Sequence, residues 1–478
     1  MAPRFSEMIE EARLSARALL DYGDHFFNPT VRLGVTGLSR AGKTVFITAL
    51  IHGLTRGGRF PVFEPFATGR IAQARLAPQP DDAVPRFDYE NHVRTLIEER
   101  RWPNSTVDIS ELRLVIDYQR KNGADRTLTL DIVDYPGEWL LDLPLLNKSY
   151  EQWSHESLGL SRERPRAPLA AQWHAHLATL SAEAHEDEQA ALTEARLFTD
   201  YLGACRDERF AMSLLPPGRF LMPGDLDNSP ALTFSPLNLS REGSPGSLAR
   251  MMARRYEAYK SAVVRPFFRE HFARLDRQIV LADVLTALNA GPAAIAELEM
   301  ALAAVLASFR LGRTNWLNGL VTRKIDRILF AATKADHLHH GDHDRLEAIL
   351  GRLVARAAER AKFAGAKVDV LALASVRATR EASVTRIGDT LPSIIGTPLP
   401  GETIDSRTFD GATEAALFPG DLPTDTDGVF KLDAPPTDVR FVRFRPPRLE
   451  RTAEGLKLSL PHIRLDRALE FLLGDKLA

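Results

Sequence analysis

Short β-branched segments alternate with longer stretches of helical spacing along much of the chain. The segment at 30–37, TVRLGVTG, has the apolar, β-branched character of a buried strand, and from 43 to 57 apolar residues recur at helical intervals. Further strands are predicted within 108–120, 125–134, 277–289, 326–332 and 367–379, and further helices within 291–309 and 342–365. This alternation predicts an α/β fold, a doubly wound sheet whose ligand residues follow the carboxyl ends of the strands.

One hairpin and one long interruption break this rhythm. Asn122 and Gly123 suit a tight turn between two strands, which predicts a mostly parallel sheet with one antiparallel strand. Within 140–276 the predicted elements are helices, apart from one Pro-rich stretch, so we expect an all-helical insertion. The predicted organisation is an N-terminal docking helix at 1–28, a core domain at 29–139 and 277–384, the insertion at 140–276, and a C-terminal extension at 385–478 that packs on the core.

Composition narrows the class of protein. The formal net charge of −2 gives no global field that would recruit nucleic acid, so we expect no nucleic-acid partner. The single cysteine, Cys205, cannot form an internal disulfide, which suits a reducing compartment such as the cytoplasm. No apolar run is long enough to span a bilayer. The acidic residues of the first helix argue against a targeting peptide, while peripheral contact with a membrane stays open.

The octapeptide GLSRAGKT at 37–44 fits the phosphate-loop (Walker A) pattern G-x-x-x-x-G-K-[ST]. It lies between a predicted strand and a predicted helix, where backbone N–H groups at a helix N-terminus bind phosphate oxygens. Lys43 would bring a positive charge to the β- and γ-phosphates, and the Thr44 hydroxyl would ligate Mg²⁺. The residues expected to contact the phosphates are Gly37, Ser39, Arg40, Ala41, Gly42, Lys43, Thr44 and Val45.

A second motif, DYPG at 134–137, ends the second strand of the hairpin. A carboxylate at this position, Asp134, would hold Mg²⁺ through its water shell. Gly137 would offer its N–H to the γ-phosphate and move when that phosphate leaves. In order behind a phosphate loop, this motif predicts a segment that senses the nucleotide state.

The third and fourth motifs concern the base. TKAD at 333–336 fits [NT]-K-x-D: the carboxylate of Asp336 would accept two hydrogen bonds from guanine, and the stem of Lys334 would lie along the base, next to Thr333. Adenine lacks this pair of donors. After the last predicted strand of the core, backbone N–H groups near Ser375 would cap the guanine O6. The residues expected there are Ala374, Ser375 and Val376.

The order of these motifs is that of a guanine-nucleotide-binding domain. The segments GLSRAGKTVFITALI, DIVDYPGEWLLDLPLL, TKADH and PHIRLDRALEFLLGDKL resemble the YcjX-type stress-associated P-loop GTPases of proteobacteria. The resemblance runs from about residue 5 to the C-terminus. It implies a fold that binds GTP or GDP and carries a helical insertion, similar to the α subunits of heterotrimeric G proteins.

Catalytic residues are harder to assign from the sequence. The first switch is expected at 98–108, where Thr106 or Ser105 would ligate Mg²⁺ and Arg101 or Arg100 would act as a built-in arginine finger or remain a solvated charge. Glu138 follows the D-x-x-G glycine. It would orient the attacking water, or serve only as an acidic residue in the first turn of a helix. The residues predicted to take part in catalysis are therefore Glu138, Arg101 and Lys43.

A basic patch is also present near the C-terminus. The segment at 438–446, DVRFVRFRP, alternates as an exposed strand would. Its arginines fit either protection of a sheet edge or a surface for a partner. The residues of this patch are Arg440, Arg443, Arg445, Arg448 and Arg451.

Two functions remain compatible with these motifs. The first is a GTPase switch that binds GTP with Mg²⁺, hydrolyses it slowly, and is read by the insertion and by a protein partner, in a bacterial stress response. The second is a scaffold that GTP or GDP merely stabilises, with negligible turnover. Mg²⁺-dependent release of phosphate separates the two.

Overall fold

The computed structural model describes residues 29–38, 40–227, 229–239, 243–307, 325–386, 389–404, 406–431, 439–449 and 459–478. The docking helix predicted at 1–28 and the phosphate-loop residue Ser39 lie outside these ranges. Within the described ranges, no helix is both long enough and apolar enough to cross a membrane.

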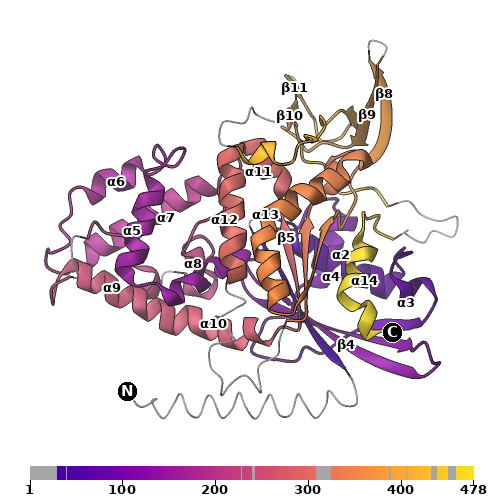
Figure 1. Cartoon of the computed structure of the whole chain (residues 1–478), viewed down its shortest axis with the longest axis horizontal. Helices are drawn as coiled ribbons and strands as arrows, with labels where there is room; N and C mark the ends of the chain where they lie inside the picture. Colours follow the sequence, from indigo (N-terminus) through magenta and orange to yellow (C-terminus); the bar gives the residue numbers. More distant parts are fainter. Residues whose placement is uncertain are drawn as a thin grey trace.

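A seven-stranded sheet lies at the centre of the core domain, in the order β2-β3-β4-β1-β5-β6-β7 (Figure 1). In this sheet, β3 runs antiparallel to both neighbours and the other pairs are parallel, which confirms the predicted sheet type. The strands are β1 (Thr30–Gly37), β2 (Ile71–Ala77), β3 (Ser110–Gln119), β4 (Asp125–Asp134), β5 (Arg277–Ala282), β6 (Arg327–Ala332) and β7 (Lys367–Ala372).

The register brings the carboxyl ends of the parallel strands to one edge of the sheet. Asp134, the last residue of β4, pairs with Val35 of β1, and Gly37 pairs with Leu281 of β5. The ends of β6 and β7 meet in the same way, since Ala332 pairs with Ala372. Motifs that are far apart in the sequence therefore lie at the same edge of the sheet.

Alternating side chains of the sheet feed two separate cores. Ile279 and Leu281 of β5 pack into the core beneath α2 (Lys43–Arg56) and α14 (Leu465–Leu473). Val280 and Ala282 point to the opposite face and pack into the other core. That second core includes α11 (Val284–Ala290), α12 (Pro292–Ala307) and α13 (His343–Phe363), and it continues into the helices of the insertion. Both faces of the sheet are thus covered by helices, as the continuous burial of β5 requires.

Between β4 and β5 the chain forms an insertion that Figure 1 shows beside α12. Its helical elements are η1 (Gly137–Asn147), α5 (Tyr150–Ser161), α6 (Ala171–Leu177), α7 (Glu188–Arg206), α8 (Gly218–Leu221), α9 (Leu248–Tyr259), the π-helical η4 (Lys260–Val264) and α10 (Arg265–Glu270). Buried aromatic rings pack together in its interior, including a stacked pair of Trp153 and Tyr256. The prediction of an all-helical insertion is confirmed.

The C-terminal extension differs from its predicted form. It contains a three-stranded antiparallel sheet of β8 (Arg380–Arg386), β9 (Asp389–Gly396) and β12 (Ala415–Leu417), and a small pair of β10 (Thr403–Ile404) and β11 (Arg407–Thr408). The strand predicted at 438–446 is wrong: its described residues make one isolated bridge, between Phe444 and Pro398. An alternating pattern without a neighbouring strand along its length does not form a ladder.

Two further differences concern the core. The region between α2 and β3 contains a strand, β2, and a short helix, α3 (Glu64–Ala67), that the sequence did not predict, followed by α4 (Tyr89–Ile97). The strand predicted at 277–289 ends at Ala282, because Asp283 caps α11 by accepting the N–H of Thr286. The short helices of the chain are η2 (Gly224–Leu226), η3 (Pro230–Leu232), η5 (Phe272–Arg274), η7 (Ala335–His337), η8 (His340–Asp342), η9 (Gly428–Phe430) and η10 (Gly474–Lys476).

Candidate functional site

The phosphate loop connects the end of β1 to the start of α2. Gly42 has φ +80°, a left-handed conformation that glycine adopts without strain, and it directly precedes the helix. Gly37 has no room for a side chain, because a Cβ there would lie 2.8 Å from the carbonyl oxygen of Leu281. Lys43 is largely buried and its Nζ donates to the Gly37 carbonyl at 3.0 Å. The lysine ammonium is thereby held over the loop, while Ala41 and Val45 lie on either side of the turn into α2.

Three oxygen ligands predicted for Mg²⁺ come together next to this loop. The hydroxyl oxygens of Thr44 and Thr106 are 3.1 Å apart, and the Thr106 hydroxyl donates to Asp134 Oδ2 at 2.7 Å. Asp134 Oδ1 is buried and has no hydrogen-bond partner among the described residues. One carboxylate with two hydroxyls, beside a loop suited to phosphates, is the kind of incomplete oxygen set that Mg²⁺ occupies together with phosphate oxygens and water.

The surroundings of Asp134 favour a cation there. Burial raises the pKa of the Asp134 carboxyl to about 6, although Lys43 and the hydrogen bond from Thr106 act in the opposite direction. A buried carboxylate with one unpartnered oxygen is stabilised when a cation binds to it. The donor set and its electrostatics therefore both fit Mg²⁺.

The D-x-x-G segment touches the phosphate loop directly. A Cβ on Gly137 would lie 1.9 Å from the Gly37 carbonyl oxygen, so glycine alone fits this contact. Glu138 is largely buried, and its side chain lines a small cavity of about 50 Å³ together with Leu38 and Arg40 of the loop. The structure thus brings Gly137 and Glu138 to the phosphate loop, as their motif predicts.

The arginines proposed for the first switch lie elsewhere. The Arg101 side chain is 74% exposed, with Glu99 at 3.7 Å. Arg100 is half-buried, and its Nε donates to the carbonyl oxygen of Pro446 in the C-terminal extension. Neither arginine lines the cavity that contains Glu138.

A different arginine, Arg206, lines that cavity. It is the last residue of α7 in the insertion, and its guanidinium contacts the sulfur of Met222 at 3.3 Å. No carboxylate pairs with it among the described residues, whereas Arg40 pairs with Glu208 at 3.0 Å. Sequence reasoning missed Arg206, since no motif surrounds it and only the tertiary packing of the insertion brings it beside Glu138.

The predicted base-reading motif follows β6. Lys334 adopts a left-handed conformation with φ +62°, and its Nζ forms an ion pair with Asp283 at the end of β5. Asp336 is buried, and its Oδ2 accepts the N–H of Ala378 at 2.8 Å. The hydroxyl of Thr379 donates to the Asp336 carbonyl oxygen, while Thr333 lies buried at the end of the strand.

The loop after β7 is tied to the C-terminal extension. The N–H of Ala374 donates to the Ile463 carbonyl oxygen at 3.1 Å, so this amide is not free to meet a base. The N–H groups of Ser375 and Val376 have no acceptor among the described residues. Of the three residues predicted to cap the guanine O6, these two keep an available donor.

Comparison with known proteins adds an independent finding. A profile of the YcjX-like family, DUF463, matches residues 31–477. A protein named Ras-like GTPase YcjX from Escherichia coli (strain K12) is 37% identical over 465 residues, which cover 94% of this chain and 96% of the relative. A protein of the same name from Shewanella oneidensis is 35% identical over 480 residues, 94% of each chain. The matches include the phosphate loop, the insertion and α14.

Proposed function

This chain belongs to the YcjX-like family, and we propose that it is a guanine-nucleotide switch that binds GTP or GDP with Mg²⁺ and hydrolyses GTP slowly. The observation that carries this proposal is the meeting of Thr44, Thr106 and Asp134 beside a lysine-bearing phosphate loop. In such proteins the first-switch threonine joins the metal only when the γ-phosphate is present. The names of its relatives support the choice of GTP.

Each residue of the site has a defined role in this proposal. The backbone from Gly37 to Thr44 binds the β- and γ-phosphates, and Lys43 leaves the Gly37 carbonyl to contact them. Mg²⁺, when bound, neutralises charge on the phosphates. Asp336 accepts the two donors of guanine while Ser375 and Val376 donate to its O6. The contact of Gly137 with the phosphate loop makes the D-x-x-G segment sensitive to the γ-phosphate.

The hydrolytic step uses two side chains that share one cavity. Glu138 orients a water molecule whose oxygen bonds to the γ-phosphorus as the bond to the β–γ bridging oxygen breaks, which yields GDP and inorganic phosphate. Arg206 donates to the phosphate oxygens on which negative charge develops, the role of an arginine finger. The positive charge of Arg206 also offsets the negative charge that the Glu138 carboxylate places next to the phosphates.

The insertion is placed to read the nucleotide state. A Cβ on Gly218 of α8 would lie 2.0 Å from the carbonyl oxygen of Glu138, so this contact transmits any displacement of the switch. The indole of Trp139 donates to the Met222 carbonyl oxygen at 2.9 Å and lies beneath the Arg219 guanidinium. A protein partner in a bacterial stress response would bind the surface that these contacts rearrange.

A second candidate is a scaffold that the nucleotide merely stabilises. It is favoured by Glu138 itself, because a carboxylate near the γ-phosphate opposes catalysis unless a cation compensates it. The two candidates differ in one measurement. Single-turnover release of phosphate from bound GTP should require Mg²⁺ if the protein is a switch, and should be absent if it is a scaffold.

Base discrimination tests the proposed ligand. Against adenine, the buried carboxylate of Asp336 would meet no matching donor, so GTP should be preferred over ATP by roughly 10⁴-fold. In Asp336→Asn, the amide oxygen can still accept the Ala378 N–H while the amide nitrogen donates to the 2-carbonyl of xanthine. The variant should lose affinity for GTP and gain affinity for xanthosine triphosphate. Competition titrations with the three triphosphates measure this, and equal competition by ATP and GTP on the wild type would refute the proposal.

A further inference from the structure

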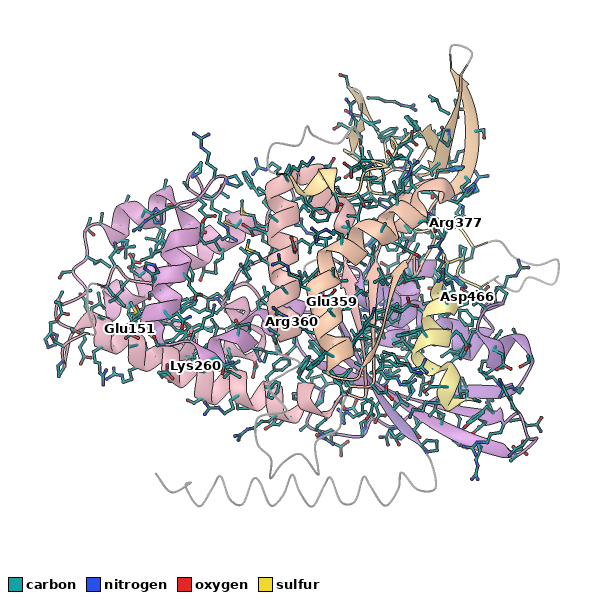
Figure 2. All side chains as sticks on the ribbon, in the orientation of Figure 1. Glu151, Lys260, Glu359, Arg360, Arg377 and Asp466 are labelled. Carbon is teal, nitrogen blue, oxygen red and sulfur yellow. The ribbon has the colours of Figure 1, made fainter. Side chains whose placement is uncertain are left out.

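A second, larger cavity lies outside the nucleotide site. Its volume is about 1140 Å³, slightly above the usual range for small-molecule sites. Its walls come mainly from the segment after α2, the loop after β7, the segment before α14 and the C-terminal segment at 445–449. Figure 2 labels two of its residues, Arg377 and Asp466, on the side of the molecule that carries α14.

Positive charge dominates the walls of this cavity, which carry seven arginines and three carboxylates. The carboxylates are already engaged. Glu381 pairs with Arg377 at 3.3 Å, and Glu414 pairs with Arg380 at 2.6 Å. The third, Asp466, accepts the N–H of Val62 at 3.1 Å.

Four arginines are left without an acidic partner among the described residues. Arg464 pairs with Asp344 and Glu347 outside the cavity walls, which leaves Arg59, Arg100, Arg445 and Arg448. Arg100 and Arg445 are half-buried. Burial lowers the pKa of Arg100, and the nearby charges of Arg448 and Arg445 lower it further. Like charges gathered at a partly buried site are unfavourable unless an anion binds between them.

The geometry points to a site for a small anion with two or more phosphate groups, either a soluble phosphorylated compound or a lipid headgroup. Guanidinium groups bind phosphate oxygens in bidentate fashion and are weakly hydrated, which suits a partly buried site. Four such groups around one space exceed what a single phosphate would need. None of the residues assigned to the nucleotide lines this cavity, so the site is separate from the proposed GTP site.

The cavity is connected to the guanine reader by one loop. Ala378 and Thr379 line the cavity, and the same two residues donate to the side chain and the backbone of Asp336. The walls also include Arg100, in the segment that leads to Thr106 of the proposed magnesium cluster. An anion in the cavity would therefore act on the nucleotide site, and by linkage the nucleotide would act equally on the anion.

Tripolyphosphate is a direct probe of this site. It should be titrated into the full chain loaded with Mg²⁺ and GDP, with equimolar Mg²⁺ added so that the free metal concentration stays constant. We expect binding to the wild type. The double variant Arg445→Gln with Arg448→Gln should lose roughly 100-fold in affinity, about tenfold for each charge-assisted contact.

Matched variants make the result specific. Arg356→Gln with Arg360→Gln removes the same charge from the exposed face of α13 and should bind like the wild type. Lys43→Ala disables the proposed nucleotide site and should still bind tripolyphosphate, with an affinity that changes only by the coupling between the two sites. Absence of binding to the wild type, equal loss in both double variants, or loss of binding in Lys43→Ala would each overturn the proposal. Failure of GTP binding would not, because the cavity does not depend on it.

Two further arms identify the source of the anion and its effect. Vesicles of phosphatidylcholine with and without cardiolipin test a lipid headgroup: retention by cardiolipin vesicles that the Arg445 and Arg448 changes abolish supports a lipid source, and equal retention of the variant refutes one. The release rate of fluorescent GDP should change with tripolyphosphate in the wild type and not in the cavity variant. An unchanged rate in the wild type would refute the link to Asp336.

Discussion

At the residue scale, burial sets what the carboxylate of Asp134 can do. One of its oxygens accepts from Thr106 while the other has no partner among the described residues, and its pKa is raised to about 6 by burial. An unpartnered buried carboxylate is a cost to the folded protein that a bound cation removes. Binding of Mg²⁺ at the proposed site would therefore stabilise this edge of the sheet through this side chain.

The proposed finger is the sharpest test at this scale. Arg206→Ala removes the guanidinium beside Glu138 and should slow single-turnover hydrolysis by about 10³-fold, the lower end of what an arginine finger contributes. Affinity for GTP should stay within a few-fold, because the charge that Arg206 neutralises develops in the transition state. Stoichiometric binding of aluminium fluoride to the GDP-bound protein should be lost as well.

The control for this change lies three residues away. Arg209 is 79% exposed and pairs with Asp207, so Arg209→Ala should hydrolyse GTP like the wild type. Equal rates for Arg206→Ala and the wild type would mean that Arg206 only stabilises the C-terminal end of α7 as a cation. Arg206→Lys keeps that structural charge without the bidentate fork, and it should remain slow if the finger hypothesis is right.

The positions of site residues could be predicted from the sequence where a motif is local. Lys43, Thr44 and Asp336 stand in short patterns whose chemistry can be read from spacing, and the structure puts them at one sheet edge. Arg206 could not be found in this way, because it reaches Glu138 only through the packing of the insertion. Arg101 was chosen for its nearness in sequence to Thr106, and its side chain lies in solvent instead.

At the element scale, the contact between η1 and α8 joins the D-x-x-G segment to the rest of the insertion. Asp142 of η1 accepts the N–H of Gly218 at 2.6 Å and the hydroxyl of Tyr259 at 2.6 Å. Trp139 packs beneath Arg219 in the same interface. A hydrogen bond and a cation–π contact therefore fix α8 against the segment that follows Gly137, and Tyr259 ties α9 to the same carboxylate.

Gly218→Ala tests this coupling. The added Cβ would lie 2.0 Å from the Glu138 carbonyl oxygen, so α8 or the switch must move. We expect the change in Trp139 fluorescence between GDP and a non-hydrolysable GTP analogue to be reduced. The other four tryptophans dilute the signal, so the measurement needs Trp139→Phe as its baseline.

Gly203→Ala is the matched control for Gly218→Ala. A Cβ at Gly203, within α7, would meet no atom within 4 Å, and alanine is a better helix former than glycine by about 1 kcal/mol. This variant should keep the nucleotide-dependent fluorescence change. Should Gly218→Ala behave in the same way, the insertion does not read the switch through α8.

Asp142 gives a second test through pH. Burial raises the pKa of its carboxyl from 3.8 to about 6, so the folded state holds the proton more tightly than the unfolded state. The stability from this group is fully present below pH 4 and is lost as pH rises through 6. At about 1.4 kcal/mol per pKa unit, the loss is roughly 3 kcal/mol.

Asp142→Asn removes this titration without changing the size of the side chain. The difference in unfolding free energy between wild type and variant should therefore fall as pH rises from 4 to 7, whatever the offset caused by the altered hydrogen bonds. Urea denaturation at four pH values in that range measures it. A difference that stays constant across the series would mean that the carboxyl is ionised throughout.

Elements were predictable where their pattern was long and locally complete. The helix α2 and the hairpin of β3 and β4 follow from spacing and turn residues. The strand β2 was missed because IAQARLA at 71–77 is rich in alanine, which is depleted in strands, and has only one β-branched residue. The segment at 438–446 has the better strand pattern, yet its described residues make only scattered backbone hydrogen bonds, such as those of Arg443 and Arg445 with residues just after β9, and one isolated bridge.

At the scale of the whole molecule, the last α-helix, α14, completes the hydrophobic core of the core domain. The chain leaves the sheet at β7, builds the C-terminal extension, and returns as α14 to cover the face beneath α2. The buried Arg277 at the start of β5 ties this return down, since its guanidinium donates to Asp475 and to Asp326. Most of the C-terminal extension thus lies between two elements of the core domain, β7 and α14.

Leu469→Ala tests whether α14 belongs to the cooperative core. Leu469 is fully buried, and the cavity left by such a substitution costs about 2–5 kcal/mol. The helix α14 shares one hydrophobic core with α2, the helix that follows the phosphate loop. The lost stability should therefore lower two urea midpoints together: that of unfolding of the core domain and that of nucleotide release. Arg467→Ala, on the exposed face of the same helix, should change the midpoint little. If the two midpoints separate in Leu469→Ala, with nucleotide retained beyond the loss of α14, then the C-terminal return folds apart from the nucleotide site.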